Sequence, residues 1–295
     1  MMRARLGFIH LLTIFILALP VLPGKAQDTI DLYKPQKGSL IYWTETRTVP
    51  RPLKIYCLRL DLTCPDLELF TLPGVDPDGK GPAESTLTPP EELFAKFKAL
   101  AALNANAFAG LPGTENDIGG WYKNRPVDIQ GMVVADGKVI SPVQNGLTAF
   151  WIDKKGNPKI GNPSPGDLVW QAVSDWSTTL VLDNQVVPEP IETALHPRSA
   201  LGFDETGKWL LMVVVDGRQS GFSEGVSLYE LARLLQKKGC SQAINLDGGG
   251  SSILLVSDPD GKIRTINSPS GMSQRPVPVM LGVRKSNQRK TATDH

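Results

Sequence analysis

The chain of 295 residues is poor in the residues that build metal centres and in long apolar segments. It has only three cysteines and three histidines, so residue spacing gives no recognisable zinc site. Its 31 basic and 30 acidic residues nearly cancel, which gives no indication of nucleic acid or an anionic membrane as a partner. After residue 26 no apolar run approaches the length of a transmembrane helix. The sequence therefore predicts no stable membrane span after removal of its N-terminal segment.

That N-terminal segment, residues 1–26, has the pattern of a cleaved secretory signal. Arg3 and Arg5 give it a positive start, residues 6–22 are mostly apolar, and Gly24 and Ala26 are small residues at the expected cleavage site. An uncleaved anchor is the alternative, although an apolar run of about 17 residues is at the short limit for a membrane span. The pattern predicts an extracytoplasmic protein, either periplasmic or secreted.

The few cysteines allow one disulfide. Cys57 and Cys64 lie seven positions apart across a predicted hairpin, and in an oxidising compartment they could pair. Cys240 is expected to be a small buried apolar residue.

Strand patterns outnumber helix patterns along the chain. Alternating apolar and polar residues predict antiparallel strands over residues 39–73, and short strands separated by turns follow over 131–187. Ser227 and Glu230 form a capping box at the start of the best amphipathic helix. There is no βαβ periodicity and no internal repeat, so we expect an α+β fold with a mixed, largely antiparallel β-sheet core and a few flanking helices. The expected segments are the signal peptide 1–26, N-terminal strands 27–94 that pack on the main domain, the main domain 95–285, and a polar tail 286–295.

The most informative motif is the run NLDGGGSS at residues 245–252, here called the glycine loop. Three consecutive glycines let the backbone reach positive φ and approach a ligand closely. Successive free N–H groups in such a loop can hold an anion. The loop is no dinucleotide fingerprint, because it leads into a strand, and it lacks the lysine of a P-loop. A hairpin turn begun by Asp247 and Gly248 is the structural alternative.

Other polar residues stand at the ends of predicted strands. Asn104 interrupts an apolar strand, so its buried amide either braces the backbone or faces a ligand. Arg198 precedes one apolar strand and Arg275 precedes the last one. Asp216 and Arg218 follow the most hydrophobic strand, where a structural salt bridge is the alternative.

The glycine loop resembles the signature of the phosphodiester glycosidases. Four further stretches agree with that family in order: the strand with Asn104, the RSALG run from Arg198, the DGR run at 216–218, and Arg275. The resemblance covers roughly residues 95–285. The chain departs from the family at Asn106, where members often have Gly, and at Gln274, where they often have Glu. The resemblance implies hydrolysis of a sugar-1-phosphodiester at the anomeric carbon, which yields a free sugar and a phosphomonoester.

This chemistry assigns roles to the candidate residues. Asp247 is the first choice, and Asp216 the second, for the carboxylate that activates water or attacks the anomeric carbon. The expected substrate-binding residues are Asn104, Arg198, Arg218, Asn245, Gly248, Gly249, Gly250, Ser251 and Arg275, because guanidinium groups bind phosphate and glycine-loop amides add donors. Trp121 or Tyr122 could stack on a sugar face. The sequence requires no cofactor, but its carboxylate and amide oxygens leave a calcium or magnesium ion as an open alternative.

Two other functions remain open. A serine hydrolase would need His196 beside Ser251, and neither residue lies in a nucleophile-elbow sequence. A non-catalytic factor that binds an envelope polysaccharide or assists its assembly would use the same cationic site, and sequence does not separate binding from turnover. In the glycosidase and binding interpretations the partner is a phosphosugar or a cell-envelope glycan.

Overall fold

The computed structural model describes residues 28–79, 81–111, 120–174, 176, 178–189, 194–271 and 273–286. The expected signal peptide and nearly all of the polar tail lie outside these residues. The described chain forms antiparallel sheets with two α-helices, which confirms the predicted α+β class. Neither helix in these ranges is long and apolar enough to cross a bilayer.

The largest sheet has eight strands in the order β1-β2-β3-β17-β16-β18-β14-β15. These strands are β1 (Ile30–Asp31), β2 (Leu40–Arg47), β3 (Leu53–Asp61), β14 (Thr179–Leu182), β15 (Gln185–Val186), β16 (Arg198–Phe203), β17 (Trp209–Val215) and β18 (Gln242–Asn245). β17 is apolar along its length because both faces of the sheet are covered: Met212 and Val214 face one core cluster, and Leu211 and Val213 face another. Residues 55–61 of β3 pair with the whole of β17, so the first three strands of the chain belong to this sheet.

Three smaller sheets complete the fold, in the orders β20-β19-β6-β21-β4, β10-β9-β13-β11-β12 and β5-β8-β7. The first contains β4 (Leu67–Pro73), β6 (Ala101–Asn104), β19 (Leu254–Ser257), β20 (Ile263–Thr265) and β21 (Val279–Lys285). The second contains β9 (Val133–Ala135), β10 (Lys138–Ser141), β11 (Ala149–Ile152), β12 (Pro158–Ile160) and β13 (Gln171–Ser174). The third contains β5 (Ser85–Thr86), β7 (Phe108–Ala109) and β8 (Pro126–Ile129).

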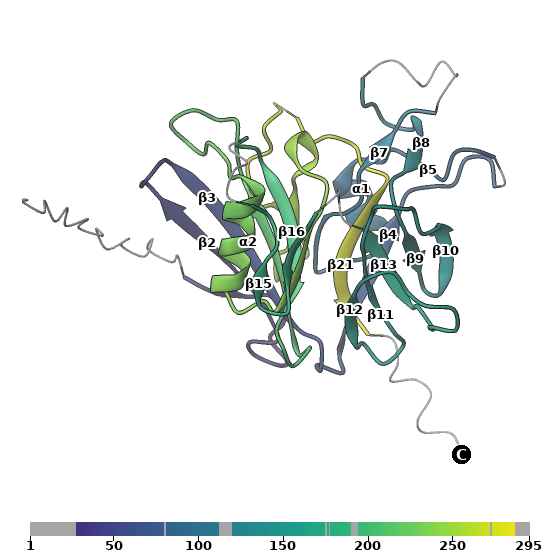
Figure 1. The fold of residues 1–295 in the computed structure, drawn as a ribbon, viewed down its shortest axis with the longest axis horizontal. Coiled ribbons are helices and arrows are strands. Elements are labelled where there is room, and N and C mark those ends of the chain that lie inside the picture. The colour runs from purple at the N-terminus through teal and green to yellow at the C-terminus, as the bar shows by residue number, and fades with distance from the viewer. Residues whose placement is uncertain are drawn as a thin grey trace, which may run out of the picture.

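The main core lies between the eight-stranded sheet and the two five-stranded sheets. Leu58 and Met212 enter it from the first sheet, Leu103 and Leu281 from the sheet of β6, and Phe150 from that of β11; each is almost completely buried. Figure 1 shows the two sheet regions side by side, with β16 and β21 facing each other across the middle of the molecule. Polar residues at the ends of β16 and β18 can therefore contact residues at the ends of β6 and β21.

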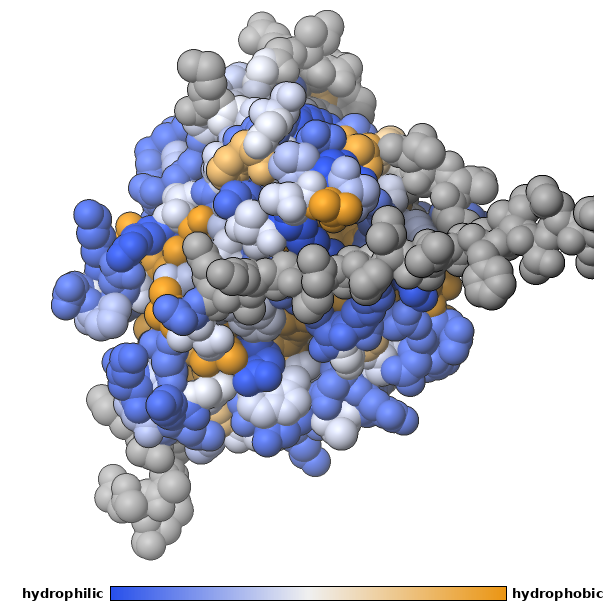
Figure 2. All heavy atoms as spheres, turned by 90° about the vertical axis from the view of Figure 1, so that its left-hand side faces the viewer, coloured by the Kyte–Doolittle hydropathy of each residue, from blue (hydrophilic) through white to orange (hydrophobic). Residues whose placement is uncertain are grey.

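The two helices cover the outer faces of these sheets. α2 (Leu228–Lys237) lies on the eight-stranded sheet, and α1 (Pro90–Lys96) packs against the sheet of β4 and β6 (Figure 1). The predicted capping box is confirmed, since Ser227 Oγ accepts from the Glu230 N–H at 3.2 Å and the Ser227 N–H donates to the Glu230 carboxylate at 3.0 Å. Figure 2 shows the side of the molecule near β2 and α2 as mostly hydrophilic, with small separate hydrophobic patches. The helices thus remove the apolar outer faces from solvent.

Cys57 and Cys64 do not form the disulfide that the sequence left open. Both thiols are free and buried, as is that of Cys240. Cys57 lies in the cluster under α2, whereas Cys64 lies in the cluster between the sheets. β3 directs Cys57 to one side of the large sheet and the turn after β3 puts Cys64 on the other, so the sequence spacing does not bring the two thiols together.

Candidate functional site

The glycine loop connects two different sheets. β18 pairs with β14 and β16, whereas β19 pairs with β6 and β20. A short 3₁₀ helix, η1 (Gly249–Ser251), makes the turn between them. The hairpin alternative is therefore wrong, because the two flanking strands do not pair with each other. The loop spans the gap between the sheets at the ends of β16 and β21 (Figure 1).

Backbone hydrogen bonds from both sides hold this crossing in place. The donors and acceptors are Leu246 N–H to Ser199 O (2.8 Å), Asp247 N–H to Ala105 O (2.9 Å) and Gly249 N–H to Pro197 O (2.9 Å). These bonds use amides that an anion-binding loop would leave open. Of the three glycine N–H groups, only that of Gly250 has no protein acceptor among the described residues.

The packing around the loop explains its three glycines. An added Cβ would meet a neighbour at each position: Pro197 O at 2.8 Å from Gly248, Arg218 Nη1 at 3.1 Å from Gly249, and Arg275 Nη2 at 2.5 Å from Gly250. Gly249 also has a φ of +60°, in the left-handed region that favours glycine. The missing side chains let two guanidinium groups and a carbonyl pack directly on the loop.

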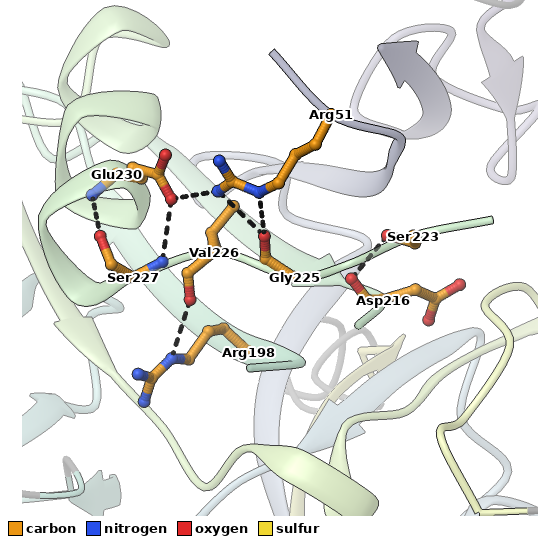
Figure 3. Close-up of polar contacts among 8 residues, drawn as sticks. All are labelled: Arg51, Arg198, Asp216, Ser223, Gly225, Val226, Ser227 and Glu230. Atoms are coloured by element: carbon orange, nitrogen blue, oxygen red, sulfur yellow. Dashed lines mark hydrogen bonds and ion pairs between the residues drawn. The ribbon is translucent and has the colours of Figure 1, made fainter. Parts of the chain in front are cut away.

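Arg198 approaches the same loop from the start of β16. It is only 8% exposed, and its Nε donates to Val226 O at 3.4 Å. A Cβ on Gly248 would lie 3.7 Å from Arg198 Cδ. Figure 3 shows how the Val226 carbonyl is held: the next residue back, Gly225, accepts from Arg51, and Arg51 also pairs with Glu230 of the capping box. The start of α2 thus supports the position of Arg198.

Arg218 and Arg275 bring two further positive charges to the loop. Arg218 Nη2 lies 3.2 Å from His196 Nδ1, and Arg275 Nη1 lies 3.4 Å from Ser251 Oγ. Burial lowers the pKa of Arg275, the charge of Asp247 raises it, and the charge of Arg218 lowers it. Neither guanidinium has a carboxylate within ion-pair distance in the described part of the chain. Positive charges gathered this way are stabilised when an anion binds between them.

Asp247 supplies the carboxylate of this cluster. Burial raises its pKa from 3.8 to about 6, while the Ser251 hydroxyl, the charge of Arg275 and the Gly248 amide act in the opposite direction. The residue still keeps part of its surface accessible. A carboxyl with a pKa near neutrality is suited to transfer protons at physiological pH.

Asp216, the second candidate carboxylate, is surrounded differently. It is 1% exposed, and its oxygens accept from Asn267 Nδ2 at 3.0 Å and from the Ser268 N–H at 2.9 Å. The Tyr56 hydroxyl is a third partner. Burial raises the pKa of Asp216, and these donors lower it. Asn267 in turn donates to Ser252 O at 3.0 Å, so Asp216 braces the far end of the glycine loop.

Asn104 braces the loop from the other sheet. Its Nδ2 donates to Asp247 O at 2.6 Å, and its Oδ1 accepts from Ser199 Oγ at 2.7 Å and from the Ile253 N–H at 3.1 Å. Of the two roles left open by the sequence, the structure shows the backbone-bracing one. Ser199 and Asn267 are partners that the sequence did not reveal, because each is a single polar residue near a strand end.

Asn245 stands at the entrance of the loop and is 1% exposed. Its Nδ2 donates to Trp176 O at 3.3 Å, whereas its Oδ1 is buried without a hydrogen-bond partner in the described chain. Ser252 Oγ, at the other end of the loop, is buried and unpartnered in the same way. Both ends of the loop therefore carry a polar atom that the protein leaves unsatisfied.

The aromatic pair expected to contact a sugar packs around an arginine instead. The Arg125 guanidinium lies 4.6 Å from the ring centre of Trp121 and 5.9 Å from that of Tyr122. Trp121 also packs edge-on against Phe108, with ring centres 4.8 Å apart. The structure does not bring this pair to the glycine loop by any contact among the described residues.

The arrangement needed for a serine hydrolase is absent from the described residues. His196 faces Arg218, and Ser251 Oγ contacts Arg275 and Asp247 rather than a histidine. Gln274, one of the two positions where the sequence departs from the pattern it resembles, donates to Glu91 at 2.9 Å and to Thr265 Oγ1 at 2.8 Å.

A hollow adjoins the cluster on the side of the Asp216 brace. Its volume is about 660 Å³, and Gln219, Asn267, Ser268 and Gln274 are among its lining residues. Asn267 and Ser268 are the partners of Asp216, and Gln274 directly precedes Arg275. No group of three or more His, Cys, Asp or Glu side chains that could hold a metal ion occurs within the described ranges.

Two known proteins resemble parts of this chain in sequence. An uncharacterized SPbeta prophage-derived protein of Bacillus subtilis is 46% identical over 82 residues, which are 28% of this chain and 12% of that protein. The Bos taurus N-acetylglucosamine-1-phosphodiester alpha-N-acetylglucosaminidase is 40% identical over 62 residues, 21% of this chain and 11% of that protein. The chain thus matches only about a tenth of the length of these two relatives.

Structural similarity to a known protein extends over more of the chain than sequence similarity does. The catalytic domain of zebrafish N-acetylglucosamine-1-phosphodiester alpha-N-acetylglucosaminidase superposes with a TM-score of 0.60 at 19% identity, covering 90% of this chain and 89% of that one. A family model described as phosphodiester glycosidase matches residues 98–284, which include the glycine loop and every residue placed around it here from Asn104 to Arg275. The chain therefore belongs to the phosphodiester glycosidase family.

Proposed function

We propose that this protein hydrolyses a sugar-1-phosphodiester at the anomeric carbon and releases a free sugar and a phosphomonoester. The observation that carries the proposal is the position of Asp247, whose carboxyl lies in a glycine loop against which Arg198, Arg218 and Arg275 pack. An anionic diester matches the charge of the arginines, and a sugar carbon placed next to the diester would face the carboxyl.

The arginines would bind the phosphodiester and stabilise its departure. A bridging diester carries one negative charge, and a second develops as the bond between the anomeric carbon and the phosphate oxygen breaks. Burial lowers the pKa of Arg275, and repulsion by the nearby charge of Arg218 lowers it further. Increasing negative charge on the leaving phosphate relieves this repulsion, so the arginines stabilise the transition state more than the ground state.

Asp247 would act on the opposite side of that bond. In one mechanism its carboxylate takes a proton from a water molecule whose oxygen bonds to the anomeric carbon; the phosphate leaves with the bonding electrons. In the other, the carboxylate itself bonds to that carbon while the phosphate leaves with the electrons of the breaking C–O bond, and water later hydrolyses the glycosyl ester, releasing the sugar and regenerating the carboxylate. The anomeric configuration of the released sugar distinguishes the two mechanisms. Asn104 and Asp216 would act through position, since their polar groups are already bonded to the loop and its support.

Incubation with UDP-N-acetylglucosamine, UDP-glucose and a methyl ester of N-acetylglucosamine-1-phosphate tests the proposal. We expect release of free sugar from at least one diester by the wild-type protein, and at least a hundredfold slower release by Asp247→Asn. Equal rates for the two proteins would contradict the assignment of Asp247. Binding of a diester or of an envelope polysaccharide without any release of sugar would instead support the non-catalytic alternative.

We also propose an extracytoplasmic location, periplasmic or secreted. This rests on the sequence pattern of residues 1–26. Chemical sequencing of the protein purified from its natural source should give a mature N-terminus close to Gln27. An intact Met1 on an exported protein would support the uncleaved anchor instead, and a protein found in the cytoplasmic fraction would contradict this location.

A further inference from the structure

The tryptophans of this chain differ in what covers their rings. Five of the six have a cation or a ring packed against them: Lys238 on Trp43, Arg125 and Phe108 on Trp121, Lys159 on Trp151, Lys154 on Trp170, and Arg59 and Lys208 on Trp209. Trp176 has neither among the described residues, and 44% of its surface is exposed. The Trp176 indole thus keeps apolar surface in water that contact with a bound molecule would remove.

The backbone of Trp176 is tied to the entrance of the glycine loop. Its N–H donates to Asn245 O at 2.9 Å, and its carbonyl oxygen accepts from Asn245 Nδ2 at 3.3 Å. Asn245 lies two positions before Asp247. Trp176 itself lies on the connection from β13 to β14, a second point at which the chain passes between sheets. The backbone that carries the exposed indole is therefore fixed to the entrance of the glycine loop.

A second observation at the same place points to a ligand. The buried Oδ1 of Asn245 has no hydrogen-bond partner within the described chain, although the Nδ2 of the same amide holds Trp176. Buried polar atoms are almost always satisfied, so an acceptor left open here fits a hydroxyl donor from a bound molecule or from a water that accompanies it.

We propose that Trp176 is the stacking surface for the sugar ring of the substrate and sets the preference for that ring. The inference rests on the proposed function. One face of a pyranose carries C–H groups and is apolar, so it removes indole surface from water on contact, whereas the phosphate on its anomeric carbon is bound by the arginines. The two hydrogen bonds between Asn245 and the backbone of Trp176 hold the main chain that carries the indole next to the strand leading to Asp247. The protein thus binds the substrate on both sides of the bond that breaks, with Trp176 on the sugar ring and the arginines on the phosphate.

Kinetics of matched variants test the role of this indole. Trp176→Ala removes an exposed ring and leaves both main-chain bonds to Asn245, so its melting temperature and circular dichroism should match the wild type. We expect KM for the hydrolysed diester to rise about tenfold, with kcat within about threefold. Trp176→Phe, which restores an aromatic face, should recover most of the loss. Tyr122→Ala removes an exposed aromatic from the Arg125 cluster and should leave KM unchanged.

A binding measurement separates this inference from the proposed hydrolysis. The probes are the non-hydrolysable C-glycosyl methylphosphonates of N-acetylglucosamine and glucose, titrated calorimetrically into each variant. We expect Trp176→Ala to weaken binding about tenfold and the Kd of Tyr122→Ala to match the wild type. Trp176-dependent binding with no hydrolysis of any diester would keep the inference and overturn the hydrolysis. Hydrolysis with unchanged KM and Kd in Trp176→Ala, an effect confined to Tyr122→Ala, or no binding of either probe would overturn the inference.

Discussion

The surroundings of Asp216 and Asp247 differ although the two residues look alike in sequence. Each follows an apolar strand of the eight-stranded sheet, and burial raises the pKa of both carboxyls. The carboxylate of Asp216 accepts from Asn267, Ser268 and Tyr56, so every oxygen has a protein partner. Asp247 has a hydroxyl, one amide and a nearby positive charge, and keeps accessible surface. A raised pKa therefore does not by itself identify the reacting group; the number of protein partners separates the two.

The largest expected effect is a loss of turnover on substitution of Asp247, the carboxylate with fewer hydrogen-bond partners. Asp247→Asn keeps the size of the side chain and the backbone bond to Asn104, but the amide can neither accept the proton of water nor attack carbon. We expect kcat to fall by about 10²–10⁴-fold with KM little changed, as measured by release of free sugar from the best diester. Asp216→Asn is the matched comparison, and a loss as large as that of Asp247→Asn with an unchanged melting temperature would reverse the two roles.

The next effect concerns the cation that packs on Gly250. Arg275→Met keeps most of the length of the side chain and removes the charge, so the phosphodiester loses a charge-assisted contact. We expect KM to rise by about 10–100-fold, measured by steady-state kinetics. Arg284→Met is the control, because Arg284 forms an ion pair with Glu68 on β4 and has no contact with the loop. Equal KM values for these two variants would exclude Arg275 from phosphate binding.

The sequence predicted the members of the site better than their mutual arrangement. The glycine loop, Arg198, Arg218 and Arg275 were recognised from residue type and order, and the structure brings them together. The crossing of the loop between two sheets was not predictable, since a hairpin and a crossing have the same local pattern of apolar runs and glycines. They differ only in which distant strands β18 and β19 pair with.

Residues that act through others were also invisible in the sequence. Asn267 and Ser199 are isolated polar residues, and nothing in their neighbours indicates that they hold Ser252 and Asn104. The capping box of α2, by contrast, was predicted correctly because both of its hydrogen bonds join residues three positions apart. Local hydrogen bonds leave a sequence pattern, whereas bonds between distant segments do not.

The pH dependence of kcat/KM should also depend on the Asp247 carboxyl, with a smaller change in rate than the one caused by Asp247→Asn. If Asp247 must be ionised, kcat/KM should decline below its pKa of about 6 and be roughly tenfold lower at pH 5 than at its plateau. For stability the sign is opposite: a carboxyl whose pKa is raised on folding binds more protons in the native state, so this group's contribution to stability is lost as pH rises from about 4 to 6. Asp247→Asn should remove that trend from the free energy of unfolding measured in urea. A wild-type pH–rate profile flat from pH 5 to 8 would contradict an ionised Asp247.

Removing the Asp216 carboxylate, whose oxygens are all hydrogen-bonded to the protein, should lower the free energy of unfolding more than it lowers kcat. Asp216→Ala leaves Asn267 Nδ2 and the Ser268 N–H without their acceptor in a buried region. We expect the free energy of unfolding in urea to fall by about 2–4 kcal/mol, since each unsatisfied buried group costs roughly 1–3 kcal/mol. Loss of kcat in the folded fraction should stay well below that of Asp247→Asn. An unchanged unfolding midpoint would show that the hydrogen bonds to Asp216 do not hold the end of the loop.

The smallest expected effect lies farthest from the reacting bond, at Arg51. Its guanidinium holds Gly225 O at 3.1 Å and pairs with Glu230, and the next carbonyl along the chain, that of Val226, accepts from Arg198 (Figure 3). Arg51→Ala should let this segment move and misplace Arg198, which would raise KM about threefold without altering the pH at which kcat/KM declines, because Asp247 is untouched. Arg47→Ala is the control, since Arg47 pairs with Glu45 on the same strand and reaches neither α2 nor Arg198. If Arg51→Ala lowers only the unfolding midpoint and leaves KM at the wild-type value, the start of α2 stabilises the fold without positioning Arg198.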